Sequence, residues 1–113
     1  DALAARWFRG VQTTDTNGMV YFKSCFPGWY PSRTTHLHFK VVSGNVQSLV
    51  SQFCFDDTLS NAIYQNHVDY TGEAKDTPNS RDTVFGSEYN DYAFYITQNE
   101  DDSMTAYKTI QIS

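Results

Sequence analysis

Side chains alternate between polar and apolar from His36 to Val41, and this pattern is typical of a β-strand over residues 35–42. The stretch THLHFKVV places His36 and His38 at alternate positions, with Leu37 and Phe39 following each of them. Successive side chains of a strand point to opposite faces of its sheet. The pattern therefore predicts a strand with two neighbouring imidazoles on one face and apolar side chains on the other.

Other stretches have strand character and are separated by turn residues. The stretch SLVSQFCF (48–55) follows across Gly44-Asn45, so it is expected to form an antiparallel hairpin with residues 35–42. Asn17-Gly18 predicts a second tight turn. The other expected elements are strands at 19–24, 92–98 and 104–112, a short helix near 59–66 and a polar loop at 71–80. Short strands between turns indicate an all-β domain, either a sandwich or a barrel.

The length and the charge of the chain limit what it can do. A chain of 113 residues can bury one core, and no repeat or linker divides it, so residues 1–113 are expected to act as a single folding unit. The net charge is -5 and the eight Lys and Arg residues form no basic run, so nucleic acid is not expected as a partner. No apolar stretch approaches the roughly 20 residues of a membrane helix, so no membrane partner is expected.

The cysteines and the start of the chain bear on its cellular location. Cys25 and Cys54 allow one disulfide at most, and the sequence leaves open whether they pair or are two buried thiols. The chain begins with Asp and has no signal-peptide pattern, so the true N-terminus is expected to have been removed or not included. The many Tyr and Phe residues and the few Lys residues favour a secreted or periplasmic protein.

Tyr30 precedes His36 by six positions and adds an oxygen donor to the two imidazoles. Zinc sites and Fe(II) oxygenase sites use Cys, His or carboxylates, and neither pattern is found around His36 and His38. A tyrosine ligand must lose a proton despite its usual pKa of about 10, and a trivalent cation such as Fe(III) favours that loss. Alternatively, the two histidines are simply exposed or hydrogen-bonded. A cupin site would need a glutamate that the following residues FKVVSGN lack.

The run RGVQTTDTNGMVYFKSCFPGWYPSRTTHLHFKV, from Arg9 to Val41, resembles the intradiol ring-cleavage dioxygenases. The resemblance is strongest to the extracellular, single-chain relatives of protocatechuate and catechol dioxygenases. The family pattern is R-G-x-Q-x-T-D-x-x-G, then P-G-x-Y, then R-x-x-H-x-H, and this chain contains each element in that order. The resemblance continues more loosely through residues 49–57 and 75–85. It implies a β-sandwich fold.

The resemblance also implies roles for five residues. Tyr30 would be the axial tyrosinate ligand of Fe(III), and His36 and His38 would be its two imidazole ligands. Arg33 matches the arginine beside the substrate ring, and Gln52 matches a glutamine that supports the same pocket. The family's equatorial tyrosine lies upstream of the R-G-x-Q segment, where this chain has none. The resemblance therefore implies an incomplete catalytic domain over residues 1–113, completed by an N-terminal segment or by a second chain.

The function implied by the resemblance is intradiol cleavage of a catechol-type diol by O2, giving a cis,cis-muconate-type product. Fe(III) would be the only cofactor. One alternative is a secreted β-sandwich that binds metal without catalysis. Another is a binding module for a polyphenol or a carbohydrate, in which Trp29 and nearby tyrosines form a stacking surface. His67 matches no ligand position and is expected to be a solvated histidine.

Overall fold

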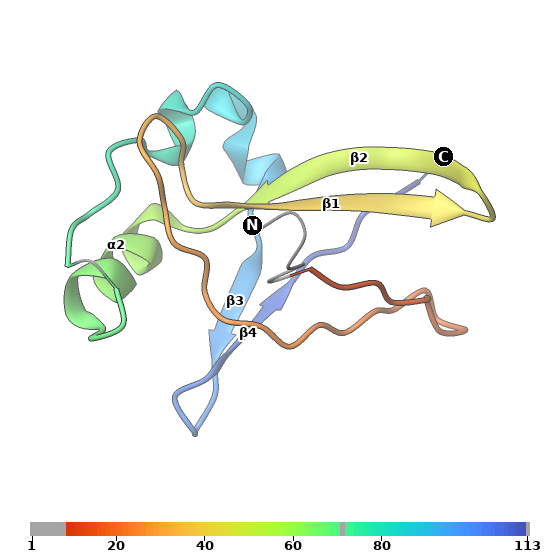
Figure 1. Cartoon of the computed structure of the whole chain (residues 1–113), viewed down its shortest axis with the longest axis horizontal. Helices are drawn as coiled ribbons and strands as arrows, with labels where there is room; N and C mark the ends of the chain where they lie inside the picture. Colours follow the sequence, from red (N-terminus) through yellow and green to blue (C-terminus); the bar gives the residue numbers. More distant parts are fainter. Residues whose placement is uncertain (1–8, 71, 113) are drawn as a thin grey trace.

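The structure, a computed structural model, describes residues 9–70 and 72–112 and contains two separate antiparallel sheets of two strands each (Figure 1). One sheet pairs β1 (His36–Ser43) with β2 (Val46–Cys54), and the other pairs β3 (Tyr95–Gln98) with β4 (Met104–Tyr107). Three helical elements lie between the sheets in sequence, namely the α-helix α2 (Asp57–Asn66) and the 3-10 helices η1 (Asn79–Arg81) and η2 (Gly86–Tyr92).

The predicted hairpin is confirmed and forms the long arm of the molecule in Figure 1. Its register pairs His36 with Cys54 and His38 with Gln52, with one irregularity between Val41 and Val42. Directly paired residues of an antiparallel ladder project from the same face of the sheet. The register therefore places Gln52 on the histidine face of the hairpin.

The end of β2 joins the hairpin to the second sheet. Cys54 forms an isolated parallel bridge with Ala93, and its carbonyl oxygen accepts a hydrogen bond from the backbone N–H of Phe94 at 3.1 Å. The side chain of Cys54 is fully buried at this junction. The base of β1 and β2 is thereby fixed to the body of the molecule.

A chain of aromatic contacts forms the core at this junction. Phe55 lies against Phe26 and Phe94, with ring centroids 4.9 and 5.0 Å apart, and Phe94 also contacts Phe53 at 4.8 Å. Phe53 in turn stacks on Phe39 of β1 at 4.2 Å. Aromatic pairs at such distances stabilise a core beyond the burial of their area. The hairpin is therefore packed against the residues that lead into α2 and β3.

The helix expected near 59–66 is confirmed and begins two residues earlier, at Asp57. Asp56 caps it, since its carboxylate accepts a hydrogen bond from the N–H of Leu59 at 2.9 Å, which satisfies one free donor of the first turn. Ser60 and Tyr64, four residues apart, are its buried side chains. This spacing places both on the face that packs against the core.

The strand expected at 19–24 is wrong, because these residues pair with no strand among the described residues. Tyr21 and Phe22 in this segment are 72% and 59% exposed. The Asn17-Gly18 turn before them is confirmed: Gly18 has a φ of 76°, and its N–H donates to the carbonyl of Asp15. High β-propensity gives a strand only where a hydrogen-bonding neighbour exists.

The remaining strands are shorter than expected, with β3 confined to Tyr95–Gln98 and β4 to Met104–Tyr107. The polar loop expected at 71–80 is found, apart from Thr71, which lies outside the described residues, and η1 begins at its end. The mostly β architecture agrees with the expected fold class, and the sandwich itself stays a prediction. Both cysteines are free thiols, with Cys25 exposed and Cys54 buried. Within the described residues, no helix has the length and apolar character needed to span a membrane.

Candidate metal centre

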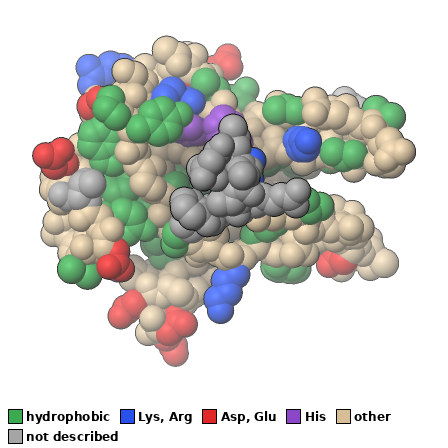
Figure 2. Space-filling model, in the orientation of Figure 1, with side chains coloured by type: hydrophobic (Ala, Val, Ile, Leu, Met, Phe, Trp, Pro, Cys, Tyr) green, Lys and Arg blue, Asp and Glu red, His purple; other side chains and the backbone are tan. Residues whose placement is uncertain are grey.

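His36 and His38 stand next to each other on β1, as the alternation predicts. Their ring centroids are 4.9 Å apart with the planes inclined at 76°. His36 is partly buried at the base of the hairpin, whereas His38 is exposed. Histidine side chains reach the surface where the hairpin joins the body of the molecule (Figure 2).

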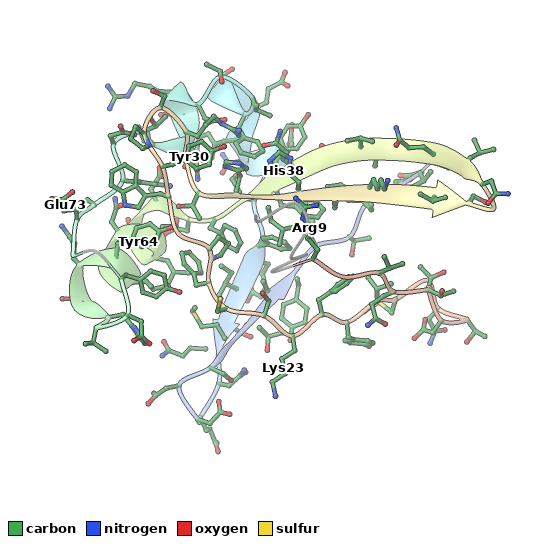
Figure 3. The ribbon with its side chains drawn as sticks, in the orientation of Figure 1. Arg9, Lys23, Tyr30, His38, Tyr64 and Glu73 are labelled. Carbon is green, nitrogen blue, oxygen red and sulfur yellow. The ribbon has the colours of Figure 1, made fainter. Side chains whose placement is uncertain are left out.

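A turn before β1 brings Tyr30 to the same place. The N–H of Arg33 donates to the carbonyl of Tyr30, and Ser32 has a φ of 77°, a left-handed conformation that is uncommon outside glycine. The carboxylate of Asp76 accepts a hydrogen bond from the Ser32 N–H at 3.2 Å and so holds the turn. As a result the Tyr30 hydroxyl lies 3.2 Å from Nε2 of His36, and Tyr30 and His38 appear in the same region of Figure 3.

The hydrogen bonds of His36 fix which ring nitrogen carries the proton. Nδ1 lies 2.7 Å from the carbonyl oxygen of Thr34, which can only accept, so Nδ1 carries the hydrogen and Nε2 has the free lone pair. Burial lowers the pKa of His36, the bond to Thr34 opposes this, and the nearby Arg33 and His38 lower it further. His36 is therefore a neutral imidazole with Nε2 facing Tyr30, which is the form that binds metals.

Arg33 lies between the histidines and the buried interior. Its Nη2 donates to Oε1 of Gln52 at 2.8 Å, and its Nη1 lies 3.4 Å from Nε2 of His36. Its Nε donates to Oδ1 of Asp82 at 2.8 Å. The hydrogen bond to Asp82 raises the pKa of Arg33, so the group is a permanent cation beside the imidazoles.

Asp82 is the member of this cluster that the sequence did not identify. Its side chain is fully buried and accepts backbone hydrogen bonds from Thr34, Val84 and Phe85 in addition to those from Arg33. Burial alone would raise the pKa of Asp82, but the Arg33 guanidinium and these three N–H groups hold it below its ordinary value. Asp82 follows Arg33 by 49 positions, so no local spacing connected the two.

A buried polar network supports the segment that leads into β1. Lys75 donates from Nζ to Oγ1 of Thr34 at 2.6 Å and forms an ion pair with Asp57 at 2.6 Å. Oγ1 of Thr34 donates to Oδ1 of Asn79 at 2.6 Å, and Nδ2 of Asn79 donates to the carbonyl of Phe55. These bonds anchor the residues before His36 to the start of α2 and to η1.

The donors at this place fit a hard trivalent cation. Within residues 9–70 and 72–112, no group of three or more His, Cys, Asp or Glu side chains could hold a metal ion. A site built on His36 and His38 therefore needs another kind of donor, and the Tyr30 hydroxyl lies close enough to His36 Nε2 for both atoms to bind one ion. Two imidazoles and a phenolate suit Fe(III), since anionic oxygen is a hard ligand. His67 lies elsewhere, with its ring against Tyr70.

The five residues singled out in the sequence thus occupy one place. Tyr30, Arg33, His36 and Gln52 are linked by contacts of 2.8 to 3.4 Å, and His38 adjoins His36. The arrangement offers a neutral imidazole, a second exposed imidazole, a phenol that is 54% exposed and a fixed cation. Such a set can bind a cation and an anionic ligand of that cation at the same time.

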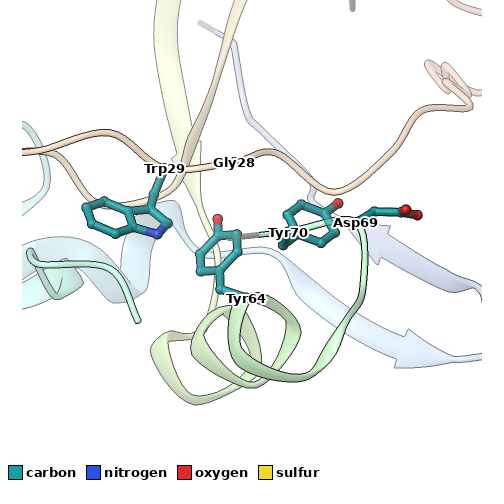
Figure 4. Close-up of a pocket in the computed structure, with 5 residues that line it drawn as sticks. All are labelled: Gly28, Trp29, Tyr64, Asp69 and Tyr70. Carbon is teal, nitrogen blue, oxygen red and sulfur yellow. The ribbon is translucent and has the colours of Figure 1, made fainter. Parts of the chain in front are cut away.

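A separate hollow, here called the aromatic groove, has a volume of about 370 Å³ (Figure 4). It is lined by Gly28, Trp29, Tyr64, Asp69 and Tyr70. The Trp29 indole N–H donates to the Glu73 carbonyl, and the tyrosine hydroxyls donate to carbonyls of residues 26 and 27, each at 2.6 Å. These bonds hold all three rings in place. The groove adjoins the candidate metal centre in sequence, because its Trp29 immediately precedes the centre's tyrosine.

Comparison with solved structures gives two similar proteins. One is an intradiol ring-cleavage dioxygenase from Tetranychus urticae, with a TM-score of 0.72 and 27% identity over 82% of this chain and 47% of that chain. The other is a protein described as a dioxygenase, with a TM-score of 0.76 and 28% identity over 88% of this chain and 49% of that chain. The chain therefore spans about half the length of the structures it matches. No protein-family model matches it, and a search of curated proteins gives no match.

Proposed function

We propose that this chain, whose sequence motifs and fold resemble those of the intradiol ring-cleavage dioxygenases, carries out ring cleavage of a catechol-type diol by O2. Tyr30, His36 and His38 would hold a non-heme Fe(III) ion, and the product would be of the cis,cis-muconate type with both oxygen atoms of O2 retained. The observation that carries the proposal is that Tyr30 Oη and Arg33 Nη1 lie 3.2 and 3.4 Å from His36 Nε2 in a chain similar to structures of dioxygenases.

Tyr30 is suited to take up a proton from the substrate. A bound Fe(III) would supply Lewis acidity and redox chemistry. The Tyr30 side chain is half exposed, and its partners are His36 and Arg33 within the same centre, so little packing opposes its movement away from the imidazoles. As a phenolate it would be a strong base for a catechol hydroxyl. His36 would keep its orientation throughout, because its Nδ1–H remains bonded to the Thr34 carbonyl.

Arg33 and Gln52 supply charge and alignment. The guanidinium of Arg33 stands beside His36, where it would stabilise negative charge that develops on the substrate ring. Oε1 of Gln52 accepts a hydrogen bond from Nη2 of Arg33, so Gln52 acts on the substrate through the arginine. Neither residue needs to change its protonation state in this role.

The test combines a spectrum with an activity measurement. After loading with Fe(III), the protein should show a broad visible band from phenolate to iron, and anaerobic catechol should shift this band to longer wavelength. With O2, catechol, protocatechuate or hydroxyquinol should be converted to a muconate-type product with one O2 consumed per ring. His38→Ala should abolish conversion, and His67→Ala, which changes a histidine outside the centre, should not. Conversion by His38→Ala at the parent rate would rule the proposal out.

The aromatic groove favours a second candidate function, a noncatalytic binding module for a polyphenol or a carbohydrate. The half-buried Trp29 and Tyr70 offer fixed ring faces, and the Asp69 carboxylate offers an acceptor for hydroxyl groups. In that case Trp29→Ala should abolish binding of a phenolic ligand, measured by calorimetry, while His36→Ala should leave it unchanged. A protein that binds metal but consumes no O2 with any catechol would instead be a noncatalytic metal-binding protein.

A further inference from the structure

We propose that Asp82 is a positioning residue that holds the guanidinium group of Arg33 with Nη1 toward the candidate metal centre. The inference rests on the proposed function, in which Arg33 stabilises charge on the substrate ring. Asp82 touches none of Tyr30, His36 or His38 through the hydrogen bonds that the structure gives it. Arg33 is the side chain through which Asp82 reaches the centre, and the backbone of Thr34, which holds His36, is a second route that the double-variant cycle below separates.

The hydrogen bonds of Arg33 to Asp82 and Gln52 leave its Nη1 group directed at the candidate metal centre. Nε donates to Oδ1 of Asp82 at 2.8 Å, and Nη2 donates to Oδ2 of Asp82 at 3.2 Å and to Gln52 at 2.8 Å. A guanidinium has one hydrogen on Nε and two on each Nη. The hydrogens of Nε and Nη2 are thus used, and Nη1, which lies 3.4 Å from Nε2 of His36, faces the centre.

Asp82 can fix this orientation because it is itself immobile. Oδ1 also accepts the N–H of Thr34 at 2.9 Å, and Oδ2 also accepts those of Val84 and Phe85 at 3.0 and 3.3 Å. Both carboxylate oxygens are therefore held by backbone groups on two segments far apart in the sequence. The side chain is fully buried, so water does not compete for these bonds.

The two parallel bonds from Arg33 to Asp82 define the plane of the guanidinium, and a single bond could not. The contact with Gln52 is one bond to a neutral amide, about which the group could rotate. The Phe85 ring lies 6.0 Å from Cζ of Arg33 and limits movement on one side only. Loss of the Asp82 carboxylate should therefore keep the positive charge of Arg33 but allow its guanidinium group to rotate.

The kinetic test uses Asp82→Asn, which keeps the shape of the side chain and one oxygen acceptor. We expect kcat for catechol cleavage to fall about 10- to 100-fold, because a small displacement of a catalytic group lowers the rate by about that factor. KM should change little. The matched control is Asp101→Asn, since Asp101 also accepts hydrogen bonds from a backbone N–H and a side chain but lies in the turn after β3. The control should retain the parent kcat. An unchanged kcat in Asp82→Asn would overturn the inference.

A double-variant cycle separates positioning from a general structural role. Arg33→Lys keeps the cation but removes the planar fork that Asp82 binds. If Asp82 acts only through Arg33, adding Asp82→Asn to Arg33→Lys should lower kcat by less than about threefold further. Effects that multiply fully in the double variant would show that Asp82 supports the fold rather than the arginine, and would overturn the inference.

A measurement independent of turnover is the NMR signal of the Arg33 Nε–H, assigned by its loss in Arg33→Lys. In the parent we expect a sharp signal that exchanges slowly with water. Asp82→Asn should broaden it and speed its exchange at least tenfold, while the signals of the exposed Arg9 and Arg81 stay unchanged. An unaltered Arg33 signal in Asp82→Asn would overturn the inference. Where Asp82→Asn does not fold, Asp82→Glu replaces it, because the carboxylate is kept but shifted by one methylene.

The two proposals can fail separately. A parent protein that cleaves no catechol would disprove the proposed function, and the NMR signal would then decide by itself whether Asp82 orients Arg33. A parent that cleaves catechol, with Asp82→Asn equal to it in kcat and in the Arg33 signal, would keep the function and disprove the positioning role.

Discussion

The hydroxyl of Tyr30 donates to Nε2 of His36 across 3.2 Å, and so it satisfies the lone pair that a metal ion would use. The geometry follows from two local facts, the Thr34 carbonyl that holds the proton on Nδ1 and the turn at Ser32 that returns the tyrosine to the strand. The fold thus brings a phenol and an imidazole within hydrogen-bonding distance of each other.

Removal of the Tyr30 hydroxyl should lower the rate of catechol cleavage and leave the stability of the fold nearly unchanged. We expect Tyr30→Phe to lower the rate of catechol cleavage by about 100-fold or more, the size expected for loss of a positioned proton acceptor. The visible band of the iron-loaded protein should disappear with it. Because the side chain is half exposed, the melting temperature should change little. Tyr95→Phe, on the exposed face of β3, is the control and should retain both band and rate.

His36 should dominate the affinity for metal. His36→Ala removes the one partly buried imidazole with its Nε2 lone pair directed at Tyr30, so binding of Co²⁺ as a probe should weaken by more than about tenfold. Calorimetric titration of the parent and the variant measures this directly. His67→Ala should bind Co²⁺ as the parent does. Equal loss in both variants would show that the bound metal is not at the candidate centre.

The buried carboxylate of Asp82 should make stability depend on acid pH. Its pKa is lower in the folded protein than the value of about 3.9 in an unfolded chain, so the stabilisation is complete above that value and is lost as the pH falls below it. At pH 7, Asp82→Asn should lower the free energy of unfolding by about 1 to 3 kcal/mol, because charged hydrogen bonds are lost. In urea titrations at pH 7 and at pH 3, the difference between parent and variant should shrink at the lower pH. A difference that grows instead would contradict the assignment.

Tyr64 should contribute stability through its hydroxyl. That group donates to the Pro27 carbonyl at 2.6 Å, so the hydroxyl of Thr35 donates to it in turn, also at 2.6 Å. Tyr64→Phe should therefore lower the free energy of unfolding by about 1 to 2 kcal/mol near neutral pH. Tyr21→Phe, at an exposed position, should change it by less than about 0.5 kcal/mol.

The same hydroxyl should also produce an alkaline transition. Burial raises the pKa of Tyr64 to about 12, above its ordinary value of 10.0, and the bond from Thr35 offsets part of this rise. The stabilisation is therefore complete below pH 10 and is lost as the pH rises toward 12. The difference in free energy of unfolding between the parent and Tyr64→Phe should therefore shrink as the pH rises from 10 toward 12.

The two cysteines should differ in reactivity. Cys25 is exposed, whereas Cys54 is buried and burial raises its pKa to about 11, so little thiolate is available there. A thiol reagent such as a disulfide dye should modify one group in the folded protein and two after unfolding in urea. In Cys25→Ser the folded protein should not react. Rapid modification of Cys54 in the native state would contradict its burial.

Local pattern alone was enough for several elements. The alternation of His36, Leu37 and His38 predicts β1 and the shared face of the two imidazoles, because strand geometry has a period of two. The turn at Gly18 and the helix that contains Tyr64 were likewise predicted from nearby residues. The grouping of Tyr30, Arg33, His36 and His38 was expected from a short motif, since all four lie within nine positions of each other.

The tertiary structure decided what depends on distant partners. Residues 19–24 have strand composition but no strand partner among the described residues, and composition cannot supply one. Asp82 meets Arg33 across 49 positions, and Lys75 in a polar loop is buried against Thr34 across 41. A buried charge needs an opposite charge or donors around it, and folding alone brings such partners together. The sequence determined which donors could bind a metal, whereas the fold determined how Arg33 is held beside them.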